Sequence, residues 1–405
     1  MNPLSSRLNG NSLSRRTFFR VAAGASAAAG LRMVTEPQLA RAATPHFTDP
    51  DVGIHIDANE NPMGPCEAAR KAIVDIIPRG GRYLFPWDEE LGVTFARQEG
   101  IDPGSVLAFA GSTEPLTFTV TSFTGKNRPL VTADPGYEAP VWAARDSGAP
   151  VVQVPLADPG GTARHDIKAM LAAAPNPGVI YICNPNNPTG TPTPHEDIEY
   201  AVTHASGDTI ILIDEAYIHF CGEPRSLHFV KEGRNVIVLR TFSKIYGMAG
   251  LRMGFAIGRP DLLKKIASVN GENALPVTAL VAATASLRDE ALVATRKKAV
   301  DQIRQDTTAW LNGEGFQTTP SVSNCFMVNV KRPGGQVQAA LAQKLMFVGR
   351  IWPAWPHWLR ITVGTSNEMK TFRSDFKSVM ATDTAALAPL PLPARLARRP
   401  FTHLS

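Results

Sequence analysis

Short apolar runs alternate with amphipathic stretches between about residues 105 and 260. Several runs are continuous in β-branched residues rather than apolar–polar alternations, as expected for strands covered on both faces. The stretches EPLTFTVTSF and APVWAARDSG between them are predicted to be helices. Because strands and helices alternate, the pattern predicts an α/β fold with a mostly parallel central sheet. The predicted strands are SVLAFAG, PLVTAD, VVQVPL, GVIYIC, TIILID, NVIVLR and GFAIG.

A different pattern follows this region. A long helical region is predicted from about Leu275 to Leu311, and after it come a strand (CFMVNV), a helix (GQVQAALAQKLM) and a strand (WLRITVG). The last predicted helix opens with a capping box formed by Thr365 and Glu368. These elements predict a second, smaller α+β domain.

Charge is concentrated at the two ends of the chain. The 405 residues are 44% hydrophobic and 19% charged, which is ordinary for a globular protein. The net charge of +5 and the pI near 9.0 could indicate a nucleic-acid partner. Residues 1–42 carry +5 and residues 381–405 carry +2, however, so the region between them carries −2. We therefore expect no nucleic-acid partner.

The N-terminus has the pattern of an export signal. SRRTFFR, Ser14 to Arg20, precedes the apolar run VAAGASAAAGL, whose 11 residues are too few to span a bilayer. ARA, Ala40 to Ala42, then offers small residues at the positions that a signal peptidase reads. Paired arginines with following aromatics resemble a twin-arginine signal. We predict export by the twin-arginine machinery to the periplasm or another extracytoplasmic location, without a stable membrane span. The alternative is an Ala-rich helix with a basic end on a cytoplasmic protein.

Five segments are therefore predicted along the chain. Residues 1–42 are the signal peptide, and residues 43–85 are an irregular arm that joins the small domain. Residues 86–290 form the large domain and residues 291–380 the small one. Residues 381–405 are rich in Pro, Ala and Arg, which is typical of a disordered tail.

The cysteines give no sign of a disulfide framework or a metal site. They have no CxxC spacing, and two lie in or beside apolar strand-like runs, so we expect buried free thiols. The sequence has no HExxH motif, Walker loop or metal-spaced His/Cys cluster, and no metal is predicted. The four cysteines are Cys66, Cys183, Cys221 and Cys325.

Polar residues follow two of the predicted strands. YICNPNNPTG, Tyr181 to Gly190, turns sharply at the carboxyl end of a strand, where parallel α/β sheets bind ligands. Asp214 ends a second apolar strand, and a carboxylate is costly to bury there without a cationic partner. Tyr217 is compatible with the same pocket. The plainer explanations are a turn rich in turn-forming residues and a surface acid at a strand end.

The segment TFSKIYGMAGLRMG, Thr241 to Gly254, places Lys244 and Arg252 among small residues after a third strand. A desolvated lysine loses proton affinity and becomes a nucleophile that can form a Schiff base with a carbonyl. The small residues would let a flat cofactor approach the backbone, and Arg252 could bind a phosphate bidentately. A lone lysine at a strand end is more often a solvated charge.

Together these motifs resemble a known family. NPNNPTG, DEAY and SKIYGMAGLRMG, in this order, are similar to the fold-type I pyridoxal-phosphate (PLP) enzymes. Within that group the chain most resembles the histidinol-phosphate aminotransferase family, to which ANENPMGP, GSTEPL, DPGYEAP and LRITVG are also similar. The match covers about residues 54–378. It implies the fold-type I architecture, PLP as cofactor, and a homodimer with shared active sites.

The resemblance also implies roles around the cofactor ring. Lys244 would form the Schiff base and move the proton between substrate and cofactor. Asp214 would pair with the pyridine nitrogen and keep it protonated, so that the ring acts as an electron sink. Asn187 and Tyr217 would hydrogen-bond the phenolic oxygen, and Tyr137 would stack on the ring.

The remaining roles concern anions. The resemblance places the cofactor phosphate near Ser112 and Thr113 at the start of a helix, where unpaired N–H groups and the helix dipole favour anions. Ser243 and Arg252 would complete that site. Tyr83 resembles the tyrosine that each subunit lends to the phosphate site of its partner. Arg360 would bind the substrate carboxylate as a planar fork, and Asn187 would also bind the substrate; the alternative for Arg360 is a surface arginine on a strand.

The chain departs from the family in two places. Thr113 stands where the family usually has an acid. The family's basic segment before LRITVG, which helps to bind the substrate phosphate, is here VGRIWPAWPHWLR, where Arg350 is the candidate for the family's arginine. Three tryptophans in this segment predict a stiff aromatic wall. Export also suits histidine synthesis poorly, because that pathway is cytoplasmic. The identity of the substrate therefore stays open. The tryptophans are Trp352, Trp355 and Trp358.

We therefore expect a homodimeric aminotransferase. It would exchange an amino group between an L-amino acid, or a histidinol-phosphate-like amino-alcohol phosphate, and a 2-oxo acid such as 2-oxoglutarate. One alternative keeps PLP and changes the reaction to that of a lyase, racemase, decarboxylase or cyclase. Another is an exported, non-catalytic PLP-binding protein. Lys244 and Asp214 argue against this second alternative, since a protein that only senses PLP need not keep the residues that let the ring act as an electron sink.

Overall fold

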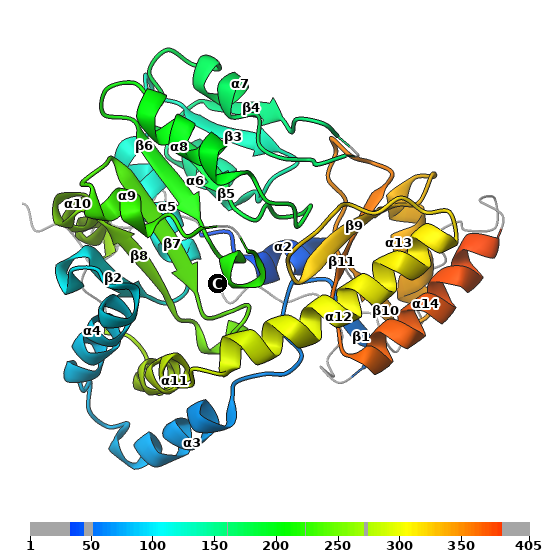
Figure 1. The fold of residues 1–405 in the computed structure, drawn as a ribbon, viewed down its shortest axis with the longest axis horizontal. Coiled ribbons are helices and arrows are strands. Elements are labelled where there is room, and N and C mark those ends of the chain that lie inside the picture. The colour runs from blue at the N-terminus through cyan, green and yellow to red at the C-terminus, as the bar shows by residue number, and fades with distance from the viewer. Residues whose placement is uncertain (1–32, 44–51, 160, 223, 271–273, 383–405) are drawn as a thin grey trace, which may run out of the picture. The chain divides into compact units, whose positions relative to one another are not determined.

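The computed structural model describes residues 33–43, 52–159, 161–222, 224–270 and 274–382, and Figure 1 shows their fold. The predicted twin-arginine motif, its apolar run and the tail from residue 383 lie outside the described residues. In the described part of the chain, no helix has the length and apolar character needed to cross a bilayer.

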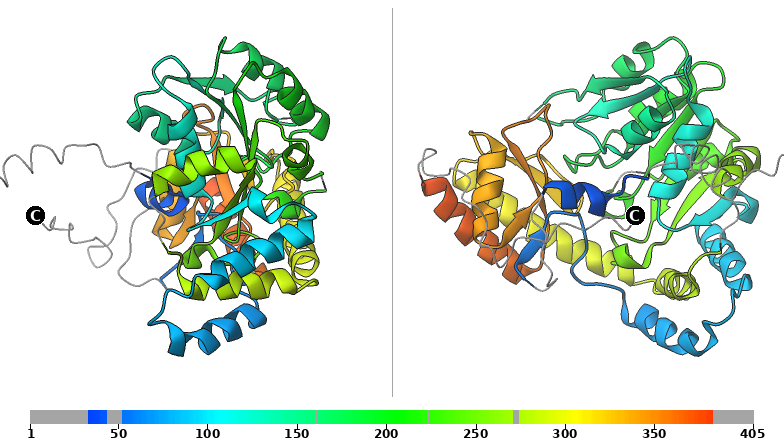
Figure 2. Two further views of the ribbon diagram at one scale, coloured as in Figure 1. Left: turned by 90° about the vertical axis from the view of Figure 1, so that its left-hand side faces the viewer. Right: turned by 180° about the vertical axis from the view of Figure 1, so that it is seen from behind.

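The central sheet has seven strands in the order β2-β8-β7-β6-β5-β3-β4. β8 pairs antiparallel with both β2 and β7, and all other pairings are parallel. Every residue of β5, β6, β7 and β8 is buried, because helices cover both faces of the sheet (Figure 2). The predicted α/β fold with a mostly parallel sheet is therefore confirmed. The strands are β2 (Val106–Phe109), β3 (Leu130–Asp134), β4 (Val151–Pro155), β5 (Val179–Cys183), β6 (Ile210–Asp214), β7 (Val236–Thr241) and β8 (Gly254–Gly258).

Helices connect these strands, and the two that the sequence predicted by name, α5 and α6, are present. Short 3-10 turns, η1 to η4, lie between them. The helices of this region are α3 (Glu67–Ile76), α4 (Pro86–Glu99), α5 (Thr113–Phe123), α6 (Ala139–Asp146), α7 (Ile167–Ala172), α8 (His195–His204), α9 (Leu227–Lys231), α10 (Pro260–Asn270) and α11 (Val277–Arg288). The turns are η1 (Ile77–Arg79), η2 (Pro103–Ser105), η3 (Ile218–Phe220) and η4 (Ala249–Leu251).

Two small sheets form the second region. β11 pairs antiparallel with β9, and β1 from the N-terminal arm pairs parallel with β10. The predicted capping box is confirmed: Thr365 N donates to Glu368 Oε2 at 2.6 Å, and Glu368 N donates to Thr365 Oγ1 at 3.3 Å. The elements are β1 (Ile54–Ile56), α12 (Leu292–Gly313), β9 (Cys325–Asn329), α13 (Gly334–Gln343), β10 (Met346–Val348), β11 (Trp358–Thr362) and α14 (Ser366–Ala381).

Two sequence predictions need refinement. The long helical region is two helices, α11 and α12, because Asp289 leaves the helical conformation (φ −84°, ψ 88°). All four cysteines are free, and three are buried, but Cys221 is only half-buried. The division into domains at residues 85/86 and 290/291 stays a prediction.

The segment before the arm also has structure. α2 (Glu36–Ala43) is a helix of eight residues, and all but Ala43 lie in the region predicted to be the signal peptide. Thr35 precedes it, and Thr35 N donates to Gln38 Oε1 at 2.9 Å. Val34, Glu36 and Ala40 are buried, so this segment packs against the folded chain rather than standing apart from it.

Candidate active site

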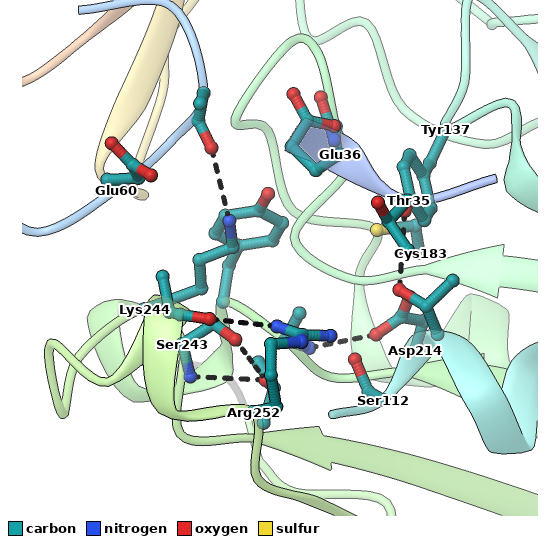
Figure 3. A pocket seen from close by; sticks show the side chains of 17 residues that line it. Thr35, Glu36, Glu60, Ser112, Tyr137, Cys183, Asp214, Ser243, Lys244 and Arg252 are labelled. Atoms are coloured by element: carbon teal, nitrogen blue, oxygen red, sulfur yellow. Dashed lines mark hydrogen bonds between the residues drawn. The ribbon is translucent and has the colours of Figure 1, made fainter. Parts of the chain in front are cut away.

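One pocket, shown in Figure 3, lies at the carboxyl ends of three neighbouring parallel strands, and its cavity volume is about 60 Å³. Cys183 ends β5, Asp214 ends β6, and Thr241 ends β7, and all three side chains line the pocket. Nine of the ten residues predicted to bind the cofactor line it as well. These nine are Ser112, Thr113, Tyr137, Asn187, Asp214, Tyr217, Ser243, Lys244 and Arg252.

Asp214 is a buried carboxylate on the pocket wall. The Tyr181 hydroxyl donates to Oδ2 at 2.9 Å, and Ala216 N donates to Oδ1 at 3.1 Å. Burial raises the pKa of Asp214 to about 6, although the bond from Tyr181 opposes the rise. None of the described residues forms a salt bridge with Asp214 in the way that buried acids usually require. The site therefore fits a ligand that brings a cation, such as a protonated ring nitrogen.

Lys244 is held by the N-terminal arm. Its Nζ donates to Asn59 O at 3.0 Å and to Ala58 O at 3.4 Å, and lies 5.6 Å from the centre of the Tyr217 ring. Burial lowers the pKa of Lys244, and the negative charge of Glu36 opposes this shift. A lysine whose ammonium is destabilised by burial is easier to convert to the neutral, nucleophilic amine.

Two glycines allow an anion site to form at the start of α5. A Cβ on Gly111, whose φ is +88°, would lie 2.2 Å from Nη2 of Arg252. A Cβ on Gly254 would lie 2.7 Å from the Ser112 nitrogen. Ser112 is the residue before α5, so its hydroxyl, the helix N-terminus and the Arg252 guanidinium meet in one place. Ser243, whose Oγ accepts from Thr241 at 3.0 Å, lines the same pocket. This donor set fits a phosphate group.

Tyr137 and Asn187 lie on the other walls of the pocket. The Tyr137 hydroxyl is 3.5 Å from Thr113 Oγ1 and within hydrogen-bonding distance of it. Asn187 Oδ1 accepts from Nη1 of Arg360 at 2.9 Å, and the Tyr217 hydroxyl accepts from Asn59 Nδ2 at 2.9 Å. Asn59 is a residue that sequence reasoning missed, although it lies in the ANENPMGP motif.

Arg360 and Arg350, the predicted substrate residues, converge on one carboxylate. Arg360 on β11 is fully buried and donates to Glu36 Oε1 at 2.6 Å. Arg350 donates to the two oxygens of Glu36 at 2.7 and 3.2 Å, and its other edge pairs with Glu138 at 2.5 and 2.8 Å. Although burial opposes ionisation, the two guanidinium groups lower the pKa of Glu36 well below its ordinary value. Sequence reasoning missed Glu36, because this residue falls within the predicted signal peptide.

An aromatic wall lies beside the two arginines. The guanidinium of Arg350 is 4.6 Å, and that of Arg360 is 5.3 Å, from the centre of the Trp352 ring. Trp352 is buried and donates to Gly136 O at 2.9 Å, and Trp355 packs on Trp358 with 5.0 Å between ring centres. The predicted tryptophan cluster therefore exists, and it supports the arginines as cation–π partners.

Tyr83 is the one predicted cofactor residue that does not line this pocket. Its side chain is 73% exposed and packs on Phe85, with 5.7 Å between ring centres. Other large apolar side chains of the same region, Met63, Val74 and Ile77, are exposed too. Its predicted role toward a partner subunit stays a prediction.

The arrangement defines a class of enzyme. A buried lysine, a buried carboxylate that no described residue pairs in a salt bridge, and an anion site at a helix N-terminus surround one pocket at the sheet edge. PLP carries the three matching groups: an aldehyde, a basic ring nitrogen and a phosphate. These features define a fold-type I PLP site.

Comparisons with known proteins agree with this class. Residues 52–375 match the family model described as aminotransferase class I and II. The chain is 31% identical to a histidinol-phosphate aminotransferase of Moorella thermoacetica, with 81% of this chain and 86% of the relative covered. It is 30% identical to an aromatic amino acid aminotransferase of Cutibacterium acnes, with 78% and 89% covered. The crystal structure of histidinol-phosphate aminotransferase from Sinorhizobium meliloti with PLP shares the fold, with a TM-score of 0.75 at 24% identity over 87% of this chain and 96% of that one.

The chain belongs to the aminotransferase class I and II family. It is therefore a PLP-dependent aminotransferase of fold type I.

Proposed function

We propose that this aminotransferase moves an amino group from a donor that carries a carboxylate or a phosphate to a 2-oxo acid, with Lys244 as the proton-transferring residue. The convergence of Lys244 and Asp214 on one buried pocket carries the proposal. When bound, PLP supplies an electron sink for the negative charge that develops at the substrate Cα. Lys244 would hold the cofactor covalently and then, as a free amine, carry the proton from Cα.

The other residues would bind and orient. Asp214 would stabilise the protonated ring nitrogen, which in turn removes the cost of burying this carboxylate. Tyr137 would stack on the ring, and Asn187 and Tyr217 would hydrogen-bond its phenolic oxygen. The phosphate would be bound by the helix N-terminus and four side chains around it, namely Ser112, Thr113, Ser243 and Arg252.

Arg360 and Arg350 would bind the donor's anionic groups. A planar guanidinium matches a carboxylate or a phosphate bidentately. The relatives named for histidinol phosphate and for aromatic amino acids support two donor classes, and the Trp352 ring beside both arginines suits a flat side chain.

We also propose a homodimer and an exported protein. Among the described residues, five of the eight exposed large hydrophobic side chains lie between residues 63 and 85, which supports an interface that covers them. Tyr83 lies in that region and would reach the phosphate site of the partner. The paired arginines before a short apolar run support export through the twin-arginine pathway.

A half-reaction screen tests the function. Purified, cofactor-loaded protein receives one amino donor at a time, including histidinol phosphate, aromatic amino acids and basic amino acids. Conversion of the cofactor to its amine form is followed by absorption. Conversion by one class of donor would support the proposal and name that class. If bound cofactor is present and no donor converts it, another PLP reaction, such as that of a lyase or decarboxylase, takes its place.

A further inference from the structure

The two arginines of the substrate side already have a carboxylate ligand, and it comes from this chain. Glu36 is 8% exposed and accepts hydrogen bonds from Arg350 and Arg360. Figure 3 shows α2 entering the pocket, with Thr35 and Glu36 beside Tyr137. Both residues belong to the wall of the pocket that contains Lys244.

This geometry is that of a bound acidic ligand. Glu36 meets Arg350 through both of its oxygens, and one of them is shared with Arg360. Arg350 also pairs with Glu138, and Arg360 forms its salt bridge with the Glu36 carboxylate. A carboxylate or phosphate of a donor could make the same bonds to Arg360 only after Glu36 leaves, because the guanidinium edge is occupied.

We propose that residues 33–43 form an autoinhibitory segment, with Glu36 as an internal competitor for the anionic groups of the substrate. This inference rests on the proposed role of Arg360 and Arg350 in binding those groups. With the segment in place the anion subsite is closed, and with the segment displaced the edges of the two guanidinium groups that Glu36 occupied are open to a carboxylate or a phosphate.

The segment is suited to reversible displacement. It is short, and the backbone bonds that order its first turn are local: Gln38 N and Leu39 N both donate to Thr35 O at 3.0 Å. A tethered group acts at an effective concentration in the millimolar range, so it competes with a free substrate without needing high intrinsic affinity. The apparent affinity for an anion is the intrinsic affinity multiplied by the fraction of molecules in which the segment is displaced.

The predicted export signal gives this segment a further consequence. Hydrolysis of the peptide bond after Ala42 by a signal peptidase would consume one water and release residues 1–42, and Glu36 would leave with them. The precursor would then be the inhibited form and the processed protein the open form. This consequence depends on the export proposal, whereas the competition by Glu36 does not.

The test uses the full-length, cofactor-loaded protein and two unreactive anions, maleate and inorganic phosphate. Binding is measured by titration of the cofactor absorption or by calorimetry. We expect Glu36→Gln to tighten the binding of at least one of these anions by about tenfold, because the internal competitor is weakened. In the unsubstituted protein, a saturating amount of that anion should speed amide hydrogen exchange of residues 33–40, since the segment is displaced.

Two matched variants separate competition from simple electrostatics. Glu138→Gln removes a negative charge from the other edge of Arg350, and Glu67→Gln removes an exposed one from α3. We expect a smaller gain from Glu138→Gln and none from Glu67→Gln. An equal gain from Glu138→Gln, or exchange in residues 33–40 that anions leave unchanged or slow down, would overturn the proposal and make Glu36 a fixed counter-ion.

A third variant tests the function on which the inference rests. In the Glu36→Gln background, where the internal competitor is weakened, Arg360→Lys should weaken the binding of the anion that Glu36→Gln strengthens. If Arg360→Lys weakens binding and Glu36→Gln does not tighten it, only the autoinhibition fails. If Arg360→Lys has no effect on either anion, the proposed substrate role of Arg360 fails as well.

Discussion

The two sides of the pocket are held together by different kinds of contact. On the cofactor side, Asp214 ends β6 and Lys244 follows β7, and the parallel pairing of these two strands brings them together. On the substrate side, Arg360 meets a glutamate 324 positions earlier in the chain, through charge pairing between separate segments. The first arrangement depends on the sheet and the second on a few ionic contacts. We therefore expect the cofactor side to be rigid and the substrate side to be adjustable.

The largest effect is expected on the cofactor side. Lys244→Ala removes both the amine that holds the cofactor and the base that moves the proton. We expect kcat to fall by about a thousandfold or more, because both covalent and general-base contributions are lost. Single-turnover conversion of the cofactor with the best donor from the screen measures this effect.

Lys264→Ala is the control for that variant, because Lys264 is an exposed lysine on α10. It should react at the rate of the unsubstituted protein. If Lys244→Ala keeps its turnover, then Lys244 only binds the cofactor and does not transfer the proton. The cofactor side would then contribute no more to catalysis than the substrate side.

The same contrast explains what could be predicted from the sequence. Asp214, Lys244 and Arg252 were predictable because each lies in a contiguous motif at a strand end, and the sheet order then brings the motifs together. The ion pairs that Arg350 and Arg360 form with Glu36 and Glu138 were not predictable. Nothing local in the sequence pairs either glutamate with an arginine more than two hundred positions away. Glu36 was further hidden by lying in a stretch with the composition of a signal peptide.

A second prediction concerns the stability of the protein without cofactor. The folded-state pKa of Asp214 is about 6 against an ordinary 3.8. Between these pH values the folded protein keeps a proton that the unfolded chain releases, so stability falls as pH rises. The loss amounts to about 3 kcal/mol above pH 7. Urea unfolding at pH 4.5 and 7.5 should show about 2 kcal/mol of this loss in the cofactor-free protein, since unfolded Asp214 is already mostly ionised at pH 4.5, and none of it in Asp214→Asn.

The difference between the unsubstituted protein and Asp214→Asn isolates the contribution of Asp214 to the pH dependence of stability. Burial lowers the pKa of His165 to about 4, which gives a slope of the opposite sign, but this slope is the same in both. Asp146→Asn, which changes an exposed acid, should follow the unsubstituted protein. Added PLP should cancel the loss in the unsubstituted protein, because a cationic ring nitrogen stabilises the carboxylate. If the free energy of unfolding depends on pH in the same way for the unsubstituted protein and Asp214→Asn, then burial does not destabilise the charged form of Asp214.

The smallest effect is expected on the substrate side, from Arg360→Lys. Lysine keeps the positive charge but loses the planar fork, so we expect KM for the amino donor to rise about tenfold while kcat changes little. Arg97→Lys, an exposed change on α4, is the control. The effect should shrink when the donor lacks an anionic group, because such a donor has nothing for Arg360 to bind. A fall in kcat as large as that of Lys244→Ala, with KM unchanged, would contradict the contrast between the two sides. Arg360 would then act on the reacting atoms or position the residues that do. The ion pairs of Glu36 with Arg350 and Arg360 would belong to the catalytic machinery rather than to an adjustable subsite.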